Sequence, residues 1–232
     1  MDAPQLTVIV PVLNEAGTVG RLLERVVAVP VPKQVVVVDD GSTDGSREAV
    51  AAFAAEHPEV ELVCHEHNRG KGAAVRTALA RARGRYTIVQ DADLEYDPQD
   101  YPRLLDAARR EGVRVVYGSR VLGRQPISYR RFYWGGRLLS LLASVLYGRR
   151  ITDEATCYKL FETELLRDLP LREDGFGFCP EATALVCRRG ERIVEVPIRY
   201  TPRSIAEGKK IRWVDGLRAI WLLVKLRFSR RR

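Results

Sequence analysis

The chain has 232 residues, of which 46% are hydrophobic and 29% are charged, so it can bury one substantial core. No run approaches the roughly 18 to 20 apolar residues that span a bilayer. The N-terminus leads directly into a predicted strand, without the basic region and apolar core of a signal peptide. We therefore expect a cytoplasmic globular protein.

The net charge of +8 is unevenly distributed along the chain. Residues 203–232 hold ten Lys and Arg against two Asp and Glu, so the first 202 residues are neutral. A basic C-terminal segment indicates an anionic partner, which could be a nucleic acid, a membrane surface or a phosphorylated substrate.

The first half of the chain alternates short apolar runs with helical patterns, which predicts an α/β fold with a mostly parallel sheet. Strands are predicted at residues 6–12, 35–38, 60–64 and 113–117, with another that begins at Tyr86 and runs into the D-A-D-L-E stretch. Helices are predicted at residues 18–29, from a cap at Ser42 or Thr43 to residue 56, from the Asn68–Gly72 turn to about residue 84, and at 101–110.

The second half has a different pattern but no composition break, so we expect one domain over residues 1–232. A helix is predicted at residues 130–147, lying across a surface, followed by a short strand at 157–161, a helix at 181–188 and a strand at 193–200. The last helix, residues 213–228, has one apolar side formed by Leu217, Ile220, Trp221, Val224 and Phe228.

The stretch Y-T-I-V-Q-D-A-D-L-E-Y-D, which begins at Tyr86, joins an apolar strand to three acidic residues. Side chains two apart on a strand face the same way, so Asp91, Asp93 and Glu95 are expected to converge just past the strand end. Three carboxylates in one small volume repel each other unless a cation joins them. Hard oxygen ligands favour Mg²⁺ or Mn²⁺.

Two further polar loops, P-V-L-N-E from Pro11 and D-D-G-S-T-D-G from Asp39, also follow predicted strands. Ligands of open α/β sheets lie beyond the carboxyl ends of the strands. The glycine motifs of dinucleotide and P-loop sites are absent. Acidic loops can bind sugar and ribose hydroxyls and reach a diphosphate through a metal, so the pattern fits a nucleotide with a metal-bridged diphosphate.

These motifs, with N-R-G-K-G and Y-G-S-R, follow one another in an order that resembles the inverting family 2 glycosyltransferases. The downstream T-D-E-A-T-C-Y-K-L-F, G-F-G-F-C-P-E-A and R-S-I-A-E-G-K-K-I stretches resemble the branch that makes polyprenyl- or dolichyl-phosphate hexoses. The resemblance covers nearly the whole chain. It implies a GT-A fold, with a nucleotide-sugar half at residues 1–125 and an acceptor half at 126–232.

The resemblance also implies roles for individual residues. The base and ribose would be enclosed by Pro11, Leu13, Glu15, Val38 and Asp40. The sugar diphosphate would be lined by Asp91, Ala92 and Asp93, and a Mg²⁺ or Mn²⁺ ion would be held by Asp91, Asp93 and Glu95. The phosphates of donor and acceptor would be gathered by Arg120, Arg203 and Lys209, and Arg131 would be a further cation for the acceptor phosphate. The catalytic residues would be Asp93, Arg120 and Asp153.

The acceptor can be argued from proton chemistry. A sugar hydroxyl must lose a proton to attack, so it needs a general base, whereas a phosphate monoester is already an oxyanion because its second pKa is about 6. A lipid phosphate therefore needs cations such as Arg120 and Arg203, and attack in line would invert the anomeric centre. The alternative is a sugar or glycolipid hydroxyl with Asp153, or Glu181, as the base. In that case Asp153→Asn would abolish transfer.

A lipid acceptor would also explain the basic C-terminal helix, which has the character of a helix lying in the headgroup layer. We expect a cytoplasmic enzyme that docks peripherally on the inner face of the membrane, unless the apolar side of this helix packs on the protein core. The donor would be GDP-mannose or UDP-glucose, since no residue decides between them. A nucleic-acid binder and a sugar nucleotidyltransferase are the other classes considered, and the acidic loops argue against nucleic acid as a partner.

Overall fold

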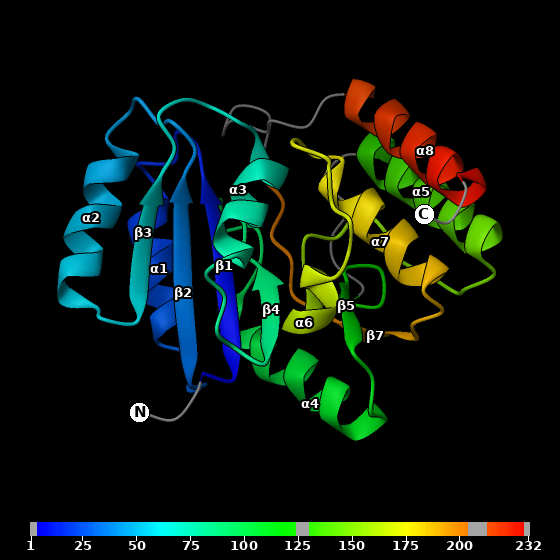
Figure 1. Ribbon diagram of the computed structural model, residues 1–232, viewed down its shortest axis with the longest axis horizontal. Coiled ribbons are helices and arrows are strands. Elements are labelled where there is room, and N and C mark those ends of the chain that lie inside the picture. Colours follow the sequence, from blue (N-terminus) through cyan, green and yellow to red (C-terminus); the bar gives the residue numbers. More distant parts are fainter. Residues whose placement is uncertain (1–3, 124–129, 204–212, 230–232) are drawn as a thin grey trace.

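The computed structural model describes residues 4–123, 130–203 and 213–229, with side chains given from Tyr133 onward in the helix that begins at Arg130 (Figure 1). The strands are β1 (Leu6–Val12), β2 (Lys33–Asp39), β3 (Val60–Cys64), β4 (Tyr86–Val89), β5 (Val115–Ser119), β6 (Lys159–Glu162) and β7 (Ile193–Pro197). The helices are α1 (Val19–Val27), α2 (Ser46–Glu56), α3 (Lys71–Leu79), α4 (Tyr101–Glu111), α5 (Arg130–Tyr147), α6 (Thr163–Arg167), α7 (Phe178–Arg188) and α8 (Trp213–Phe228), with a 3-10 turn at Pro98–Asp100.

Within the described residues the strands form one sheet in the order β3-β2-β1-β4-β6-β5-β7. All neighbouring strands are parallel except at β6, which runs antiparallel to both β4 and β5. The sheet is therefore mostly parallel, as the sequence pattern predicts. The central strands are apolar on both faces, as expected for parallel strands that helices cover.

The helices form two groups around the sheet. In Figure 1 the parallel strands rise together with their carboxyl ends at the top, and α3 packs across β1 and β2. At the other side of the molecule α7 packs between the sheet and the pair α5 and α8. A second, smaller core lies between these three helices, built from Leu139, Ala143, Ile151, Ala184, Cys187, Ala219 and Leu223.

Several predicted boundaries are confirmed to the residue, namely those of β1, β3, α5 and α8. The cap predicted at Ser42 or Thr43 is wrong, because α2 begins at Ser46 after Gly45, which has a φ of 91°. No helix in the described ranges is long and apolar enough to cross a membrane.

Candidate active site

The acidic loops meet at the carboxyl end of the sheet, at the top of Figure 1. The chain runs outward from β1 to β2 and β3, then crosses back so that β4 pairs with the other side of β1. This reversal of strand order opens a crevice beyond the strand ends, which is the usual ligand site of an open α/β sheet.

The loops after β1 and β2 are joined to each other by side-chain hydrogen bonds. The backbone N–H of Asn14 donates to Ser42 Oγ over 3.0 Å, and Asn14 Oδ1 accepts from the N–H of Thr43 over 2.9 Å. The N–H of Glu15 donates to Ser46 Oγ over 2.8 Å. Asn14 has a φ of 52°, which a short polar side chain tolerates better than most others. These bonds hold the Glu15 side chain at the edge of the crevice.

Asp40 anchors the neighbouring loop instead of presenting free oxygens to a ligand. Its carboxylate accepts from the N–H groups of Arg69 (2.9 Å) and Gly70 (2.7 Å) and lies 2.7 Å from His65 Nδ1. The side chain is buried, so its charge is balanced by these neighbours. Asp40 therefore shapes the loop at Arg69 and Gly70 in this structure, and its contact with a ribose stays a prediction.

The other residues predicted to enclose the nucleotide differ in their exposure. Pro11 and Leu13 are half-buried at the end of β1, where they can line a ligand. Val38 is 0% exposed and Ala92 is also buried, and both side chains belong to the hydrophobic core. Side-chain contact of Val38 or Ala92 with a ligand is thus not what the structure shows, because only their backbone lies near the strand ends.

Asp91 is bonded by Lys71, the lysine of the N-R-G-K-G motif, for which no role was predicted. The Nζ of Lys71, at the start of α3, donates to Asp91 Oδ1 and lies 3.5 Å from Cys157 Sγ. Burial would lower the pKa of Lys71, but the Asp91 carboxylate raises it well above its usual value. The pair is therefore a charged lysine and a carboxylate at the base of the site. The 20-residue separation of Lys71 and Asp91 gives no local signal, and only the β3-α3-β4 crossover brings them together.

Asp93 and Glu95 are tied to the segment that follows β7. The backbone N–H of Arg203 donates to Glu95 Oε1 over 2.7 Å, and the hydroxyl of Tyr200 donates to Glu95 Oε2 over 2.8 Å. The Arg203 guanidinium lies 3.0 Å from both carboxylate oxygens of Glu15 and 3.4 Å from Asp93 Oδ2. Arg203, which was predicted to bind phosphate, thus lies against the acidic loop after β4.

The predicted cage of three carboxylates is not what the described residues form, since no group of three Asp, Glu, His or Cys among them could hold a metal ion. The physical reason is that β4 ends at Val89, before the first carboxylate, so strand alternation does not extend to Asp91, Asp93 and Glu95. Leu94 has a φ of 62°, which turns the chain between Asp93 and Glu95. In this structure Asp91 is bonded by Lys71, and Glu95 is bonded by Tyr200 and by the backbone of Arg203, so the role of Asp91 and Glu95 as metal ligands stays a prediction.

Arg120 and Asp153 form an ion pair beside the group made by Asp93, Glu95 and Arg203. Asp153 Oδ2 accepts from the backbone N–H (2.9 Å) and Nε (2.8 Å) of Arg120, and Oδ1 accepts from Nη2 (2.7 Å). Burial opposes ionisation of Asp153, but the Arg120 guanidinium holds its pKa below the usual value. Arg120 also lies over the ring of Tyr200, 5.1 Å from its centroid, which connects this pair to Glu95.

Of the three remaining residues predicted from the sequence, the structure describes the side chain of one, Glu181. Glu181 is buried and accepts from the backbone N–H groups of Arg172 and Glu173, so it holds the segment before α7 and is not available as a base. Arg131 lies on α5, but its side chain is outside the described residues. Lys209 lies in residues 204–212, also outside them.

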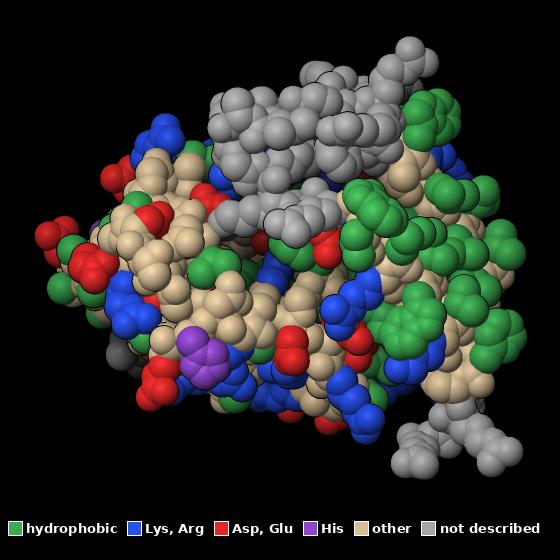
Figure 2. Space-filling view, turned by 90° about the horizontal axis from the view of Figure 1, so that it is seen from above, with side chains coloured by type: hydrophobic (Ala, Val, Ile, Leu, Met, Phe, Trp, Pro, Cys, Tyr) green, Lys and Arg blue, Asp and Glu red, His purple; other side chains and the backbone are tan. Residues whose placement is uncertain are grey.

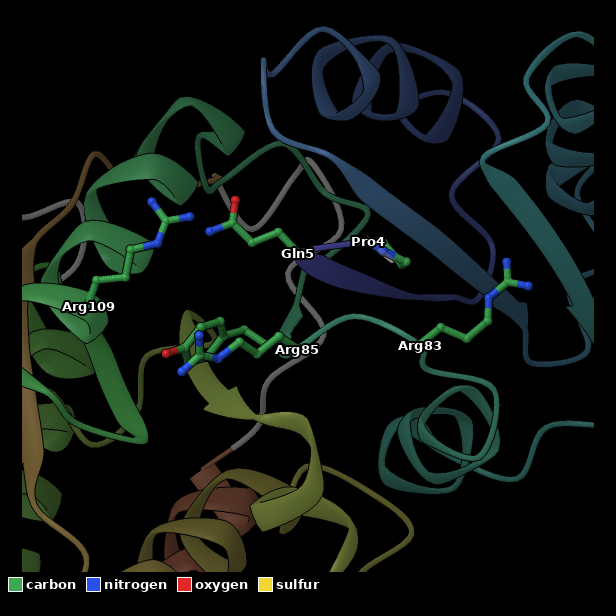
Figure 3. Close-up of a pocket in the computed structure, with 6 residues that line it drawn as sticks. Pro4, Gln5, Arg83, Arg85 and Arg109 are labelled. Carbon is green, nitrogen blue, oxygen red and sulfur yellow. The ribbon is translucent and has the colours of Figure 1, made fainter. Parts of the chain in front are cut away.

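A hollow of about 440 Å³ lies away from this cluster, where the chain enters β1 and β4. It is lined by Pro4, Gln5, Arg83, Arg85, Tyr86 and Arg109 (Figure 3). Apart from Arg109, which lies near the end of α4, these residues lie at or before the amino ends of the two strands, whereas the acidic loops follow the carboxyl ends. The hollow is therefore separate from the candidate active site.

Comparison with known proteins agrees with this arrangement. Residues 7–169 match the model of glycosyl transferase family 2. An undecaprenyl-phosphate mannosyltransferase of Micrococcus luteus is 34% identical, over 87% of this chain and 85% of the relative. The low-salt glycan biosynthesis hexosyltransferase Agl6 of Haloferax volcanii is 30% identical over 94% of this chain, which spans only 52% of that relative.

Two solved structures have the same fold. The mannosyltransferase PcManGT from Pyrobaculum calidifontis, in complex with GDP-Man and Mn²⁺, superimposes with a TM-score of 0.60 at 28% identity, covering 84% of this chain and 55% of that one. Glucosyl-3-phosphoglycerate synthase from Mycobacterium tuberculosis has a TM-score of 0.68 at 21% identity, covering 96% and 80%. With the seven-stranded sheet and the acidic crevice, these matches show that the chain belongs to glycosyl transferase family 2 and has the GT-A fold.

Proposed function

We propose that the chain transfers a hexose from a nucleotide sugar to a polyprenyl phosphate, with inversion at the anomeric carbon and with the help of a divalent metal ion. The names of the relatives support a lipid phosphate as acceptor, since the Micrococcus luteus protein is an undecaprenyl-phosphate mannosyltransferase. That relative, and the GDP-Man bound by the Pyrobaculum calidifontis structure, favour GDP-mannose as donor over UDP-glucose.

The donor would occupy the crevice between the loops of β1, β2 and β4. Pro11 and Leu13 offer apolar surface for the base, and Glu15 offers a carboxylate to ribose hydroxyls. Lys71 and Asp91 form a charged pair at the crevice base that can bind sugar hydroxyls and a phosphate oxygen. In this arrangement residues 1–125 supply most of the donor contacts, and residues 126–232 supply most of the acceptor side.

A site with Asp93 as the single protein ligand suits a divalent ion better than a site enclosed by three carboxylates. Asp93 is half-buried, and the Arg203 guanidinium lies 3.4 Å from its Oδ2, a distance longer than a good hydrogen bond. Mg²⁺ and its analogues are commonly held by one or two carboxylates together with substrate phosphates. We therefore assign Asp93 as the protein ligand and the donor diphosphate as the remainder. When bound, the ion would neutralise charge on the leaving nucleoside diphosphate.

The acceptor phosphate would be drawn to the cations on the other side of the crevice. Arg120, on the loop after β5, and Arg203, after β7, are connected through Tyr200 and Glu95, so two guanidinium groups flank the acidic loop. Arg131 and Lys209 are proposed as further phosphate ligands. A phosphate dianion held here is already a nucleophile and needs no base.

The observation that carries this proposal is the pairing of Asp153 with Arg120. A hydroxyl acceptor would require a carboxylate that the hydroxyl can reach and whose pKa is raised toward neutrality. Asp153 is buried, accepts three hydrogen bonds from Arg120 and has a lowered pKa, which suits it to orienting a phosphate-binding arginine better than to acting as a base.

The test is a donor screen with radiolabelled sugar nucleotides, a short-chain polyprenyl phosphate and Mg²⁺ or Mn²⁺, followed by organic extraction. Label is expected in the organic phase with GDP-mannose or UDP-glucose. Alkaline phosphatase treatment of the acceptor before the reaction should abolish the transfer. If dephosphorylated polyprenol or a sugar proves to be the better acceptor, the lipid-phosphate proposal is wrong.

A further inference from the structure

Helices α5 and α8 each expose a stripe of large apolar side chains. The stripe residues recur every three or four positions, so each set lies along one face of its helix. Each of these side chains belongs to a residue between 37% and 76% exposed. They are Trp134, Leu138, Leu141 and Val145 on α5, and Trp213, Val214, Leu217, Trp221, Val224 and Phe228 on α8. We call them together the α5–α8 surface.

The exposure of this surface is not caused by poor packing of the two helices, because each helix also has a separate face that is buried in the protein. Leu139 and Ala143 of α5 and Ala219 and Leu223 of α8 are buried together against α7. On the side of α8 that was predicted to be apolar, Leu217, Trp221, Val224 and Phe228 are exposed, and only Ile220 packs against the small core.

The two stripes belong to neighbouring helices. The hydroxyl of Tyr147, at the end of α5, donates to the carbonyl of Leu223 over 2.8 Å, and Arg227 Nε of α8 donates to the carbonyl of Leu146 over 2.6 Å. Figure 2 shows hydrophobic side chains gathered along one flank of the molecule, in the view from above. Scattered apolar residues are common on protein surfaces, but a continuous patch of this kind marks an interaction site.

The positive charge of α5 and α8 indicates which kind of partner would bind this surface. Their sequences contain six Lys and Arg and one Asp, and Lys225 lies 4.3 Å from the centroid of the Trp221 ring. A second copy of the chain would bring these cations against each other. Tryptophan beside lysine and arginine is the composition of segments at the headgroup level of a membrane, where anionic lipids attract the cations.

The surface lies on the side of the site that carries the proposed acceptor cations. Helix α5 starts ten residues after Arg120, and α8 starts ten residues after Arg203, the two cations proposed to bind the acceptor phosphate. In Figure 1 α8 begins at its end nearer the carboxyl ends of the strands and runs away from them, and its C-terminal part contacts that of α5. A lipid phosphate keeps its chain in the bilayer and its phosphate at the interface, so this placement suits transfer without extraction of the lipid.

We propose that the α5–α8 surface docks the enzyme on an anionic lipid bilayer, with the exposed apolar stripes inserted at the headgroup level and the active site facing the membrane. The biological role of this docking rests on the lipid-phosphate acceptor proposed above. Binding to the bilayer itself depends only on the exposed apolar stripes and on the charge of the two helices, so membrane binding and transfer can be tested separately.

The first experiment is co-sedimentation of the full chain with vesicles of phosphatidylcholine alone and of phosphatidylcholine mixed with phosphatidylglycerol. Binding is expected to the mixed vesicles and to weaken as salt is added. The paired change Leu217→Ser with Trp221→Ser should reduce binding at least about tenfold, since both side chains would lose apolar burial. Lys225→Ser should reduce binding by about fivefold, and only to the mixed vesicles.

The matched control is Arg85→Ser, which removes the same charge from an exposed residue at the opposite end of the sheet. It should leave vesicle binding within about twofold of the parent, whereas nonspecific attraction of a basic protein would lower binding equally in both charge variants. Circular dichroism melting of each variant tests whether the fold is retained. An equal loss in Arg85→Ser and Lys225→Ser would overturn the proposal.

Transfer assays separate this proposal from the proposed function. With a water-soluble short-chain prenyl phosphate, the Leu217→Ser and Trp221→Ser pair should retain its activity, and with a long-chain acceptor in vesicles it should lose activity along with binding. Vesicle binding without transfer to either acceptor would remove the proposed function and leave the docking surface standing. Transfer in solution by a chain that binds neither kind of vesicle, or that forms a dimer disrupted by the paired change, would remove the docking proposal.

Discussion

The replacement Asp153→Asn distinguishes the two acceptor chemistries most directly. Asn has nearly the same shape as Asp but carries no charge, and only one of its two terminal atoms can accept a hydrogen bond. Asp153 accepts three hydrogen bonds from Arg120, through both oxygens. The variant therefore loses at least one of them, and its amide N–H₂ faces a guanidinium that cannot accept.

The size of the effect on stability follows from burial. The side chain of Asp153 is 4% exposed and that of Arg120 is 24% exposed, so the pair is largely shielded from water. Removing one partner of a buried ion pair costs about 3 to 5 kcal/mol, and partial exposure of Arg120 favours the lower end. For a chain of this length about 3 kcal/mol corresponds to a fall in Tm of roughly 6 to 12 °C. The control Asp39→Asn, in which Arg47 bonds a buried carboxylate at 2.9 and 2.8 Å, should destabilise similarly.

The assay is kcat and KM for a short-chain polyprenyl phosphate at a temperature well below both melting points, from about pH 5.5 to 9. If Asp153 only orients Arg120, the acceptor KM rises about tenfold to a hundredfold. The fall in rate toward low pH then persists, because it reflects the second pKa of the acceptor phosphate, about 6. Asp39→Asn should leave the acceptor KM unchanged. Our reasoning is refuted if Asp153→Asn lowers kcat by about 10² or more with an unchanged KM and a flattened acid limb, since that is the loss of a general base.

Three further changes test other parts of the structure. Lys71→Met leaves Asp91 without its cation and should raise the donor KM about tenfold or more in steady-state kinetics; an unchanged donor KM would show that the pair is only structural. Asp93→Asn should lower the rate about 10²-fold and remove its dependence on Mn²⁺ concentration, whereas a normal Mn²⁺ titration would contradict its role as ligand. Burial raises the pKa of Glu154, whose side-chain oxygens have no hydrogen-bond partner among the described residues, so the folded state holds this proton to a higher pH than the unfolded chain and stability falls as pH rises above about 4.3. Glu154→Gln should therefore gain Tm relative to the parent as pH rises from about 4.3 to the folded-state pKa, and a pH-independent difference would contradict this.

The fold was largely predictable because its elements are encoded locally. The valine-rich strands and the amphipathic helices carry their periods in adjacent residues, which is why β1, β3, α5 and α8 end where the pattern ends. The position of β6 was not predictable, since nothing in K-L-F-E specifies that it lies antiparallel between β4 and β5. The start of α2 moved because Ser42 accepts a hydrogen bond from the loop after β1 instead of capping the helix.

The site was predictable in its location but not in its pairings. The acidic loops follow strands, and the topology of parallel strands gathers such loops at one end. Which cation meets which carboxylate depends on loop paths that no local pattern encodes. Arg203 is 108 residues from Glu95, and Lys71 reaches Asp91 only across a helix. The three-carboxylate prediction failed for a similar reason, because it extended strand alternation into residues that lie beyond the strand.

The pairings give a physical reason why nucleotide sugar and metal ion should bind together. The Arg203 guanidinium contacts carboxylates of two loops, those of Glu15 and Asp93, while its backbone N–H bonds Glu95. Its N–H donors lie in one plane, so a phosphate that enters the crevice competes with these carboxylates for the same donors. If the donor diphosphate and a metal ion bind here as proposed, each bond that Arg203 gives to phosphate would weaken its contact with Asp93, whose carboxylate would then need a further cation. Because linkage is reciprocal, an ion bound by Asp93 would release Arg203 for phosphate to the same extent that phosphate would release Asp93 for the ion.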